Sequence, residues 1–197
     1  MTFIDDDGRS EFYTKWKPIV EEKGVPVTVA LYTGAIGTNP SYMTIEQCKE
    51  LHGLGVEFVS HTHNHFELNT LTEEELRYEF ETSKQWLKDR GFNPNHILYP
   101  YGNANEFVRS IVREYFNSGF RTDGGVNTPP LDTYQISRQE WFGTGLTTLE
   151  DHKAFVDEAV ANDGWIVWMS HSQYTSFDST QLQAIRDLID YAQSLGV

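Results

Sequence analysis

Residues 51–65 read "LHGLGVEFVSHTHNH", and this stretch contains the pattern from which the fold can be predicted. A helical segment ends near Gly55, where glycine readily adopts the left-handed turn that follows a helix. The apolar strand Val56–Ser60 comes next, and three of the chain's seven histidines follow it directly. A strand that ends in polar, chemically active residues is typical of a parallel sheet with a site at its carboxyl edge.

The same order of helix, glycine and strand recurs along the chain. Six glycines mark the expected helix ends: Gly24, Gly55, Gly91, Gly119, Gly164 and Gly196. Helix starts are marked by capping boxes, in which a threonine and a Glu or Gln three residues later bond each other's backbone N–H groups. Thr44 with Gln47 and Thr72 with Glu75 fit this pattern.

Between these signals lie five clear strand candidates: Thr2–Asp6, Val25–Tyr32, Val56–Ser60, His96–Tyr101 and Trp165–His171. Strands that alternate with helices pair in parallel, because each helix carries the chain back across the sheet. The pattern therefore predicts an α/β fold, either a barrel or an open parallel sheet. A length of 197 residues favours a single domain over residues 1–197.

Composition excludes several classes of protein. Hydrophobic residues make up 39% of the chain, as in a globular protein, and the net charge of -14 argues against nucleic acid and anionic membranes as partners. The longest apolar run, Trp165–Met169, is too short to span a membrane. Cys48 is the lone cysteine, which excludes an intramolecular disulfide. No signal peptide is apparent, so we expect either a cytosolic protein or a segment of a longer chain.

Acidic and imidazole side chains follow the strands that this pattern predicts. His61 and His65 are four residues apart, so a helical turn would place both rings on one face, as two ligands of one metal require. A carboxylate from Asp5-Asp6-Asp7 would complete a set of two histidines and one carboxylate. From spacing alone, a polar loop with surface histidines and an acidic turn remain alternatives.

Four motifs occur in a fixed order along the chain. They are "TFIDDDG" (2–8), "SHTHNH" (60–65), "LYPYG" (98–102) and "VWMSHS" (167–172). This set resembles the polysaccharide deacetylases, also called NodB-homology domains or family four carbohydrate esterases. The resemblance implies a distorted parallel β/α barrel of about seven strands. It also implies one divalent metal, most often Zn2+ with Co2+, Ni2+ or Mn2+ as alternatives, and removal of acetyl groups from a polysaccharide or oligosaccharide.

The resemblance assigns roles to individual residues by their position in the motifs. Asp7, His61 and His65 resemble the metal ligands. Asp6 resembles the catalytic base and His171 the catalytic acid. Such a division is chemically reasonable, because hydrolysis of an acetamide needs one group to accept a proton from water and another to protonate the leaving amine.

Two aromatic residues are expected to contact substrate. The backbone N–H of Tyr101 resembles the family's oxyanion donor, and the side chain of Tyr101 would lie at the same rim. Trp141 follows a strand-like segment and could present a ring face to a sugar, although packing in the core is the alternative.

The chain departs from the family pattern at several positions. Leu98 stands where relatives carry the arginine that orients the base, and we expect Arg138 to replace it, with Arg121 as the alternative. Asp5 stands where relatives usually carry phenylalanine; it would face solvent or accept a hydrogen bond from a ligand histidine. The fourth family motif is not recognisable.

Other functions remain open at this point. The first alternative is a non-catalytic, carbohydrate-binding homologue, and the second is an unrelated metallohydrolase such as a phosphoesterase. Few basic residues accompany the motifs, which argues against a phosphate substrate. With an acetylated polymer as its partner, we expect a monomeric domain located outside the cell, at the cell surface or on a virion.

Overall fold

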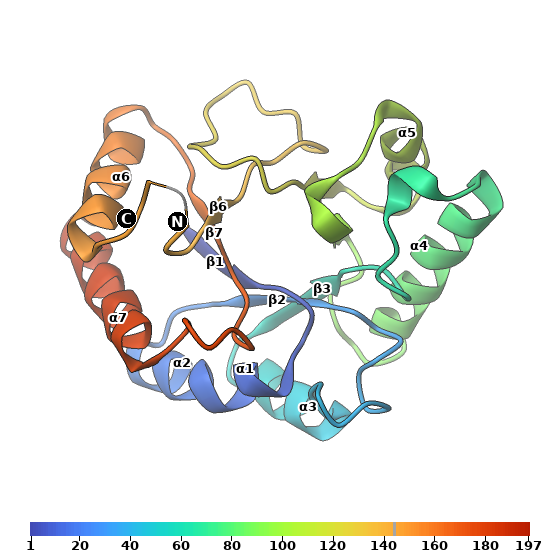
Figure 1. The fold of residues 1–197 in the computed structure, drawn as a ribbon, viewed down its shortest axis with the longest axis horizontal. Coiled ribbons are helices and arrows are strands. Elements are labelled where there is room, and N and C mark those ends of the chain that lie inside the picture. The colour runs from blue at the N-terminus through green and yellow to red at the C-terminus, as the bar shows by residue number, and fades with distance from the viewer. Residues whose placement is uncertain (144) are drawn as a thin grey trace.

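Seven parallel strands form a single curled sheet in the computed structural model, which describes residues 1–143 and 145–197 (Figure 1). The strands lie in the order β5-β4-β3-β2-β1-β7-β6. Their bounds are β1 (Thr2–Asp5), β2 (Thr28–Leu31), β3 (Glu57–Ser60), β4 (His96–Leu98), β5 (Ser118–Phe120), β6 (Gln139–Glu140) and β7 (Val167–Ser170). The predicted distorted β/α barrel is confirmed.

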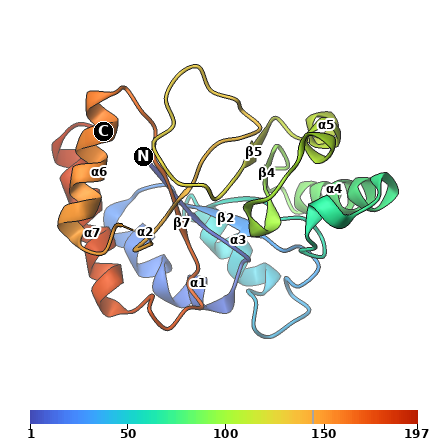
Figure 2. The same cartoon turned by 45° about the horizontal axis from the view of Figure 1, so that its top comes forward.

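Helices surround the outside of this sheet (Figure 1). They are α1 (Ser10–Lys15), α2 (Lys17–Lys23), α3 (Ile45–Gly53), α4 (Glu73–Lys88), α5 (Glu106–Tyr115), α6 (Leu149–Ala161) and α7 (Ser179–Ser194). Two short 3-10 helices, η1 (Leu68–Thr70) and η2 (Pro100–Gly102), lie in connections. The segment between β5 and β6, yellow in Figure 2, has no described helix and joins the two edge strands of the sheet.

The barrel is distorted because β5 and β6 are not paired with each other in the described sheet. An isolated parallel bridge joins Phe120 of β5 to Ile136, which lies three residues before β6. Inside the barrel lies a small apolar cluster that includes Ile4, Val59 and Leu98. A larger cluster between the sheet and the helices includes stacked aromatic rings.

Most of the predicted local signals are present. Both capping boxes form, at the starts of α3 and α4. Gly24 ends α2 in the left-handed conformation, with φ 62°. Gly119 was expected to end a helix, but it lies within β5, where a Cβ atom would collide with the Tyr99 side chain. Gly164 likewise lacks a left-handed φ, and Asp163 before it adopts one instead.

The strands are shorter than the sequence predicts. The expected strand Val25–Tyr32 pairs only over Thr28–Leu31, in part because Pro26 has no N–H for a strand ladder. The last strand stops at Ser170, one residue before His171. The glycine pattern predicts a strand that opens after Gly119, without bounds, and β5 lies there. Strand β6 was not predicted, because a segment of two residues is too short to show a pattern.

Candidate active site

The ligand atoms of Asp7, His61 and His65 converge at the carboxyl ends of β1 and β3. The two imidazole Nε2 atoms lie 3.2 Å apart. Oδ1 of Asp7 lies 3.6 Å from His61 Nε2 and 3.4 Å from His65 Nε2. The three atoms therefore form a nearly equilateral triangle with no protein group between them.

This triangle fits a tetrahedral metal. Zinc ligands lie at about 2.0–2.1 Å, and the corners of such a tetrahedron are about 3.3 Å apart. His61 Nδ1 lies 2.8 Å from the Leu98 carbonyl oxygen, so the hydrogen belongs on Nδ1 and the Nε2 lone pair faces the triangle. Burial lowers the pKa of His61 to about 4, which keeps this ring in the neutral form that a metal needs.

Left-handed backbone, and not a helical turn, brings His61 and His65 together. Thr62 and His65 have φ values of 65° and 57°, and the His65 N–H donates to Thr62 Oγ1 at 3.0 Å. The predicted helical turn is therefore wrong, although both rings do reach one point. Asp7 is also left-handed, with φ 76°. Such conformations are unfavourable for residues other than glycine and collect at functional sites.

Glu79 of α4 supports the loop that carries His61 and His65, and the sequence did not lead us to expect this role. Its side chain is buried and accepts hydrogen bonds from the backbone N–H groups of His63 and Asn64 at 2.9 and 2.7 Å. The Asn64 side chain donates to the other oxygen at 2.6 Å. A glutamate beside Phe80 on the buried face of α4 was the available signal, since unpaired carboxylates avoid such a face.

Asp6 lies beside the triangle and contacts Arg138. Nη1 of Arg138 donates to Asp6 Oδ1 at 2.6 Å, and its Nε donates to the carbonyl of Arg121 at 3.0 Å. Both partners are buried. The predicted contact that replaces the missing arginine at Leu98 is therefore present.

The other oxygen of Asp6 faces the cleft. Asp6 Oδ2 lies 3.9 Å from His61 Nε2 and 4.0 Å from His171 Nε2. Burial by itself raises the pKa of Asp6, but the charge and hydrogen bond of the Arg138 guanidinium oppose this effect, and the pKa lies below its usual value. The carboxylate is thus charged, and one of its oxygens is available to accept a proton.

His171 directly follows β7, and its imidazole lines the same cleft as Asp6. Its ring stacks on Tyr174, with centroids 4.9 Å apart. Asp5 does not play either expected part, since it is fully buried and accepts hydrogen bonds from Ser170 and Ser172. Burial raises the pKa of Asp5 to about 8, against the opposing effect of those hydrogen bonds.

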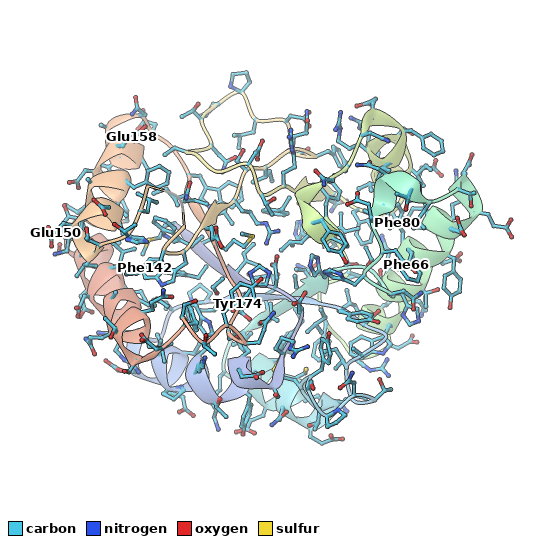
Figure 3. All side chains as sticks on the ribbon, viewed as in Figure 1. Phe66, Phe80, Phe142, Glu150, Glu158 and Tyr174 are labelled. Atoms are coloured by element: carbon cyan, nitrogen blue, oxygen red, sulfur yellow. The ribbon has the colours of Figure 1, made fainter. Side chains whose placement is uncertain are left out.

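The predicted sugar contacts divide between the surface and the core. Tyr101 is left-handed, with φ 58°, and the residue is 61% exposed at the cleft. Trp141 is only 5% exposed and packs against Phe3 and Trp168. This burial agrees with the alternative of packing in the core, and Trp141 also borders a smaller cavity of about 100 Å³. Tyr174 is the other exposed aromatic residue at the cleft, and lies between Phe142 and Phe66 in the view of Figure 3.

A single cleft of about 390 Å³ joins these groups. Its lining consists of Asp6, Asp7, His61, His65, Tyr99, Tyr101, Gly102, Thr122, Glu140, Met169, His171 and Tyr174. No lysine or arginine belongs to this lining among the residues that the structure describes. The arrangement supplies a metal site, a charged base, a candidate acid and aromatic surface in one place.

Known proteins share this fold and part of this sequence. The family model for polysaccharide deacetylases matches residues 1–117. YxkH of Bacillus subtilis, assigned by name to the polysaccharide deacetylases, is 30% identical over 136 residues, which are 68% of this chain and 48% of YxkH. Chitin deacetylase 1 of Cryptococcus neoformans is 29% identical over 175 residues, or 86% of this chain and 36% of that protein. The chain thus spans half or less of these two relatives.

Solved structures give the same result. The deacetylase PplD of Streptococcus pyogenes, in complex with acetate, superposes with a TM-score of 0.67 and 26% identity, covering 70% of this chain and 62% of PplD. A family 4 carbohydrate esterase of Streptomyces lividans, also with acetate, has a TM-score of 0.69 over 100% of this chain and 88% of that one. At 14% identity, the second likeness is one of fold alone.

Proposed function

Because the chain belongs to the polysaccharide deacetylase family, we propose that it is a metal-dependent hydrolase of acetylated polysaccharides or oligosaccharides. One observation carries the proposal. The Asp7–His61–His65 triangle, the charged Asp6 and His171 line the same cleft. A metal ligand set, a base and an acid are what the hydrolysis of an acetyl group requires.

We propose that Asp7, His61 and His65 hold one divalent metal. Their two nitrogens and one oxygen suit zinc, and the same donors also accept Co2+, Ni2+ or Mn2+. When bound, such a metal polarises the acetyl carbonyl and makes water more acidic. A donor triangle that matches tetrahedral spacing supports this assignment.

Asp6 and His171 divide the proton transfers in this proposal. Asp6 accepts a proton from the attacking water on Oδ2, while Arg138 holds Oδ1 and keeps the carboxylate charged. His171 donates a proton to the sugar nitrogen or oxygen as its bond to the acetyl carbon breaks. The products are acetate and a free amine or hydroxyl on the polymer.

Tyr101 is proposed to contribute in two ways. Its backbone N–H donates a hydrogen bond to the developing oxyanion, and its exposed ring packs against a sugar ring. Tyr101 lines the cleft in a left-handed conformation, which supports both roles. Tyr174 supplies the second exposed aromatic face at the same cleft.

The lining of the cleft favours a neutral acetylated sugar over a phosphoester. Phosphate sites usually contain arginine or lysine, and neither lines the described part of this cleft. A purely carbohydrate-binding homologue has no use for both a charged base and an acid. No described helix could cross a membrane. An acetylated polymer as substrate leads us to propose an extracellular, cell-surface or virion-associated location.

The test is acetate release from a panel of acetylated polymers. Zinc-loaded protein is incubated with chitin oligosaccharides, peptidoglycan fragments and acetylated xylan, with and without a chelator. We expect release from at least one polymer, loss of release with chelator, and recovery after zinc is restored. Asp6→Asn is the matched control, since it should keep the metal but lose turnover. Binding of polymer with no release by the zinc-loaded protein would instead favour the carbohydrate-binding alternative.

A further inference from the structure

Asp5 is joined to both residues that flank His171. Ser170 Oγ donates to Asp5 Oδ2 at 2.7 Å. The backbone N–H of Ser172 donates to the same oxygen at 2.9 Å, and Ser172 Oγ donates to Oδ1 at 2.6 Å. Asp5 and Ser172 are 0% exposed and Ser170 is 5% exposed. These three hydrogen bonds occupy both oxygens of a buried carboxylate.

Strand alternation explains why Asp5 and Asp6 have different surroundings. Successive side chains of a strand point to opposite faces of the sheet. Asp6 points to the cleft, whereas Asp5 points to the side on which Phe3 packs against the helices. Asp5 pairs in register with Ser170 of β7, so its carboxylate lies beside the last residue before His171.

A second anchor holds the same connection. Nζ of Lys15 donates to the carbonyl oxygens of Ser172 and Phe177, both at 2.7 Å. The His171 ring, by contrast, has no hydrogen bond of its own to any residue in the described part of the chain. Its position therefore depends on the backbone at residues 170–172 and on its stacking with Tyr174.

We propose that Asp5 is a positioning residue for His171. By holding the residues before and after it, Asp5 fixes the imidazole opposite Asp6 Oδ2, where a leaving group would be protonated. The three hydrogen bonds satisfy both oxygens of this buried carboxyl group, and two of them fix the residue directly after His171. The effect on rate rests on the proposed deacetylase function, whereas the effect on the ring does not.

Kinetics of Asp5→Ala, Asp5→Asn and Ser172→Ala test this role. A displaced general acid loses part of the hundredfold or greater contribution that such groups make, so we expect Asp5→Ala to lower kcat on an N-acetyl substrate by about 10- to 100-fold with KM unchanged. Asparagine can still accept from the Ser172 N–H and donate to a serine hydroxyl, so Asp5→Asn should stay within about threefold of wild type. Ser172→Ala should fall between the two.

The decisive measurement is the double variant Asp5→Ala with His171→Ala. If Asp5 acts through His171, the double variant is no slower than His171→Ala alone. Full additivity, or an equal loss of Asp5→Ala turnover on amides and on esters with good leaving groups, would overturn the proposal. Asp178→Ala is the matched control, because Asp178 accepts two backbone N–H groups at the start of α7 in the same connection. It should leave kcat unchanged.

An NMR measurement separates this inference from the proposed function. The Hε1–Cε1 signal of His171 in the zinc-loaded protein is identified by its absence from His171→Ala. We expect this signal to shift or broaden in Asp5→Ala and Ser172→Ala and to stay in place in Asp5→Asn and Asp178→Ala. An unchanged signal in folded Asp5→Ala overturns the positioning role. Absence of turnover in the wild type would refute the proposed function and still leave this comparison decisive.

Discussion

Replacement of Arg138 by methionine should sharply reduce turnover while the metal stays bound. Methionine fills much of the volume of arginine but cannot donate a hydrogen bond. The substitution therefore removes the 2.6 Å contact to Asp6 Oδ1 and the bond to the Arg121 carbonyl. None of the three proposed metal ligands contacts Arg138 through a described hydrogen bond or ion pair.

The size of the effect follows from the charge pair. Two opposite charges about 4 Å apart interact by about 4 kcal/mol at an effective dielectric constant of about 20. That energy corresponds to about three pKa units, and relaxation or water entry would leave at least about one. The pKa of Asp6 is lowered in the wild type, in part by the charge of Arg138, so removal of that charge raises the pKa. The acidic limb of kcat/KM should therefore shift to higher pH by about one to three units.

Stability should respond with a matching dependence on pH. A carboxyl group with a lowered folded pKa stabilises the protein above its unfolded pKa of about 3.9, and this stabilisation is lost as the pH falls through the folded pKa. In Arg138→Met the buried Asp6 carboxylate has lost its partner, so we expect a loss of about 3–5 kcal/mol in unfolding free energy at neutral pH. The loss should be smaller in acid, where Asp6 is protonated.

The assay combines pH–rate profiles, urea unfolding at several pH values and metal analysis of purified protein. Arg138→Lys retains the charge but not the second bond, so its shift should be smaller. Arg121→Met is the matched control, since the Arg121 side chain is bound to Gln135 and Asp123 and not to Asp6. An Arg138→Met profile with the wild-type acidic limb would refute the idea that Arg138 keeps Asp6 charged.

Three further substitutions separate the remaining roles. Asp7→Asn should lose zinc on dialysis, as measured by elemental analysis, whereas Asp6→Asn should retain it, because only Asp7 belongs to the ligand triangle. His171→Ala should slow amide hydrolysis by about 100- to 1,000-fold and the hydrolysis of an activated ester much less, in initial-rate assays, since a good leaving group departs without a proton. Glu79→Ala should weaken zinc binding by about 10- to 100-fold in a chelator competition, because the ligand loop loses its support.

The ends of the strands were the most predictable part of this site. Parallel strands place their carboxyl ends at one rim, so the sequence alone predicts that Asp6, His61 and His171 lie close together. Arg138 could also be predicted, because a buried base needs a cation and Leu98 cannot supply one. The contact is present, although strand β6, which begins directly after Arg138 and supplies Glu140 to the cleft, was not predicted.

The conformation of the connections could not be predicted. The spacing of His61 and His65 favoured a helical turn, but the same convergence is achieved by left-handed φ values at Thr62 and His65. Glu79 holds the two residues between them through their backbone N–H groups. Such a conformation depends on a buried carboxylate in a distant helix, so the sequence of the loop itself does not predict it. The burial of Trp141 could not be predicted for a similar reason, because it depends on whether Phe3 and Trp168 cover the Trp141 ring.

Strand register is what makes the run of three aspartates functional. Asp5 lies opposite Ser170 of β7 because Phe3 pairs with Trp168 and Ile4 with Met169. A slip of one residue would turn every β1 side chain to the other face, so that Asp5 would enter the cleft and Asp6 would meet the serines. The contact with Arg138 would then be lost. The apolar residues of β1 and β7 therefore determine which aspartate acts as the base, although none of them takes part in the chemistry.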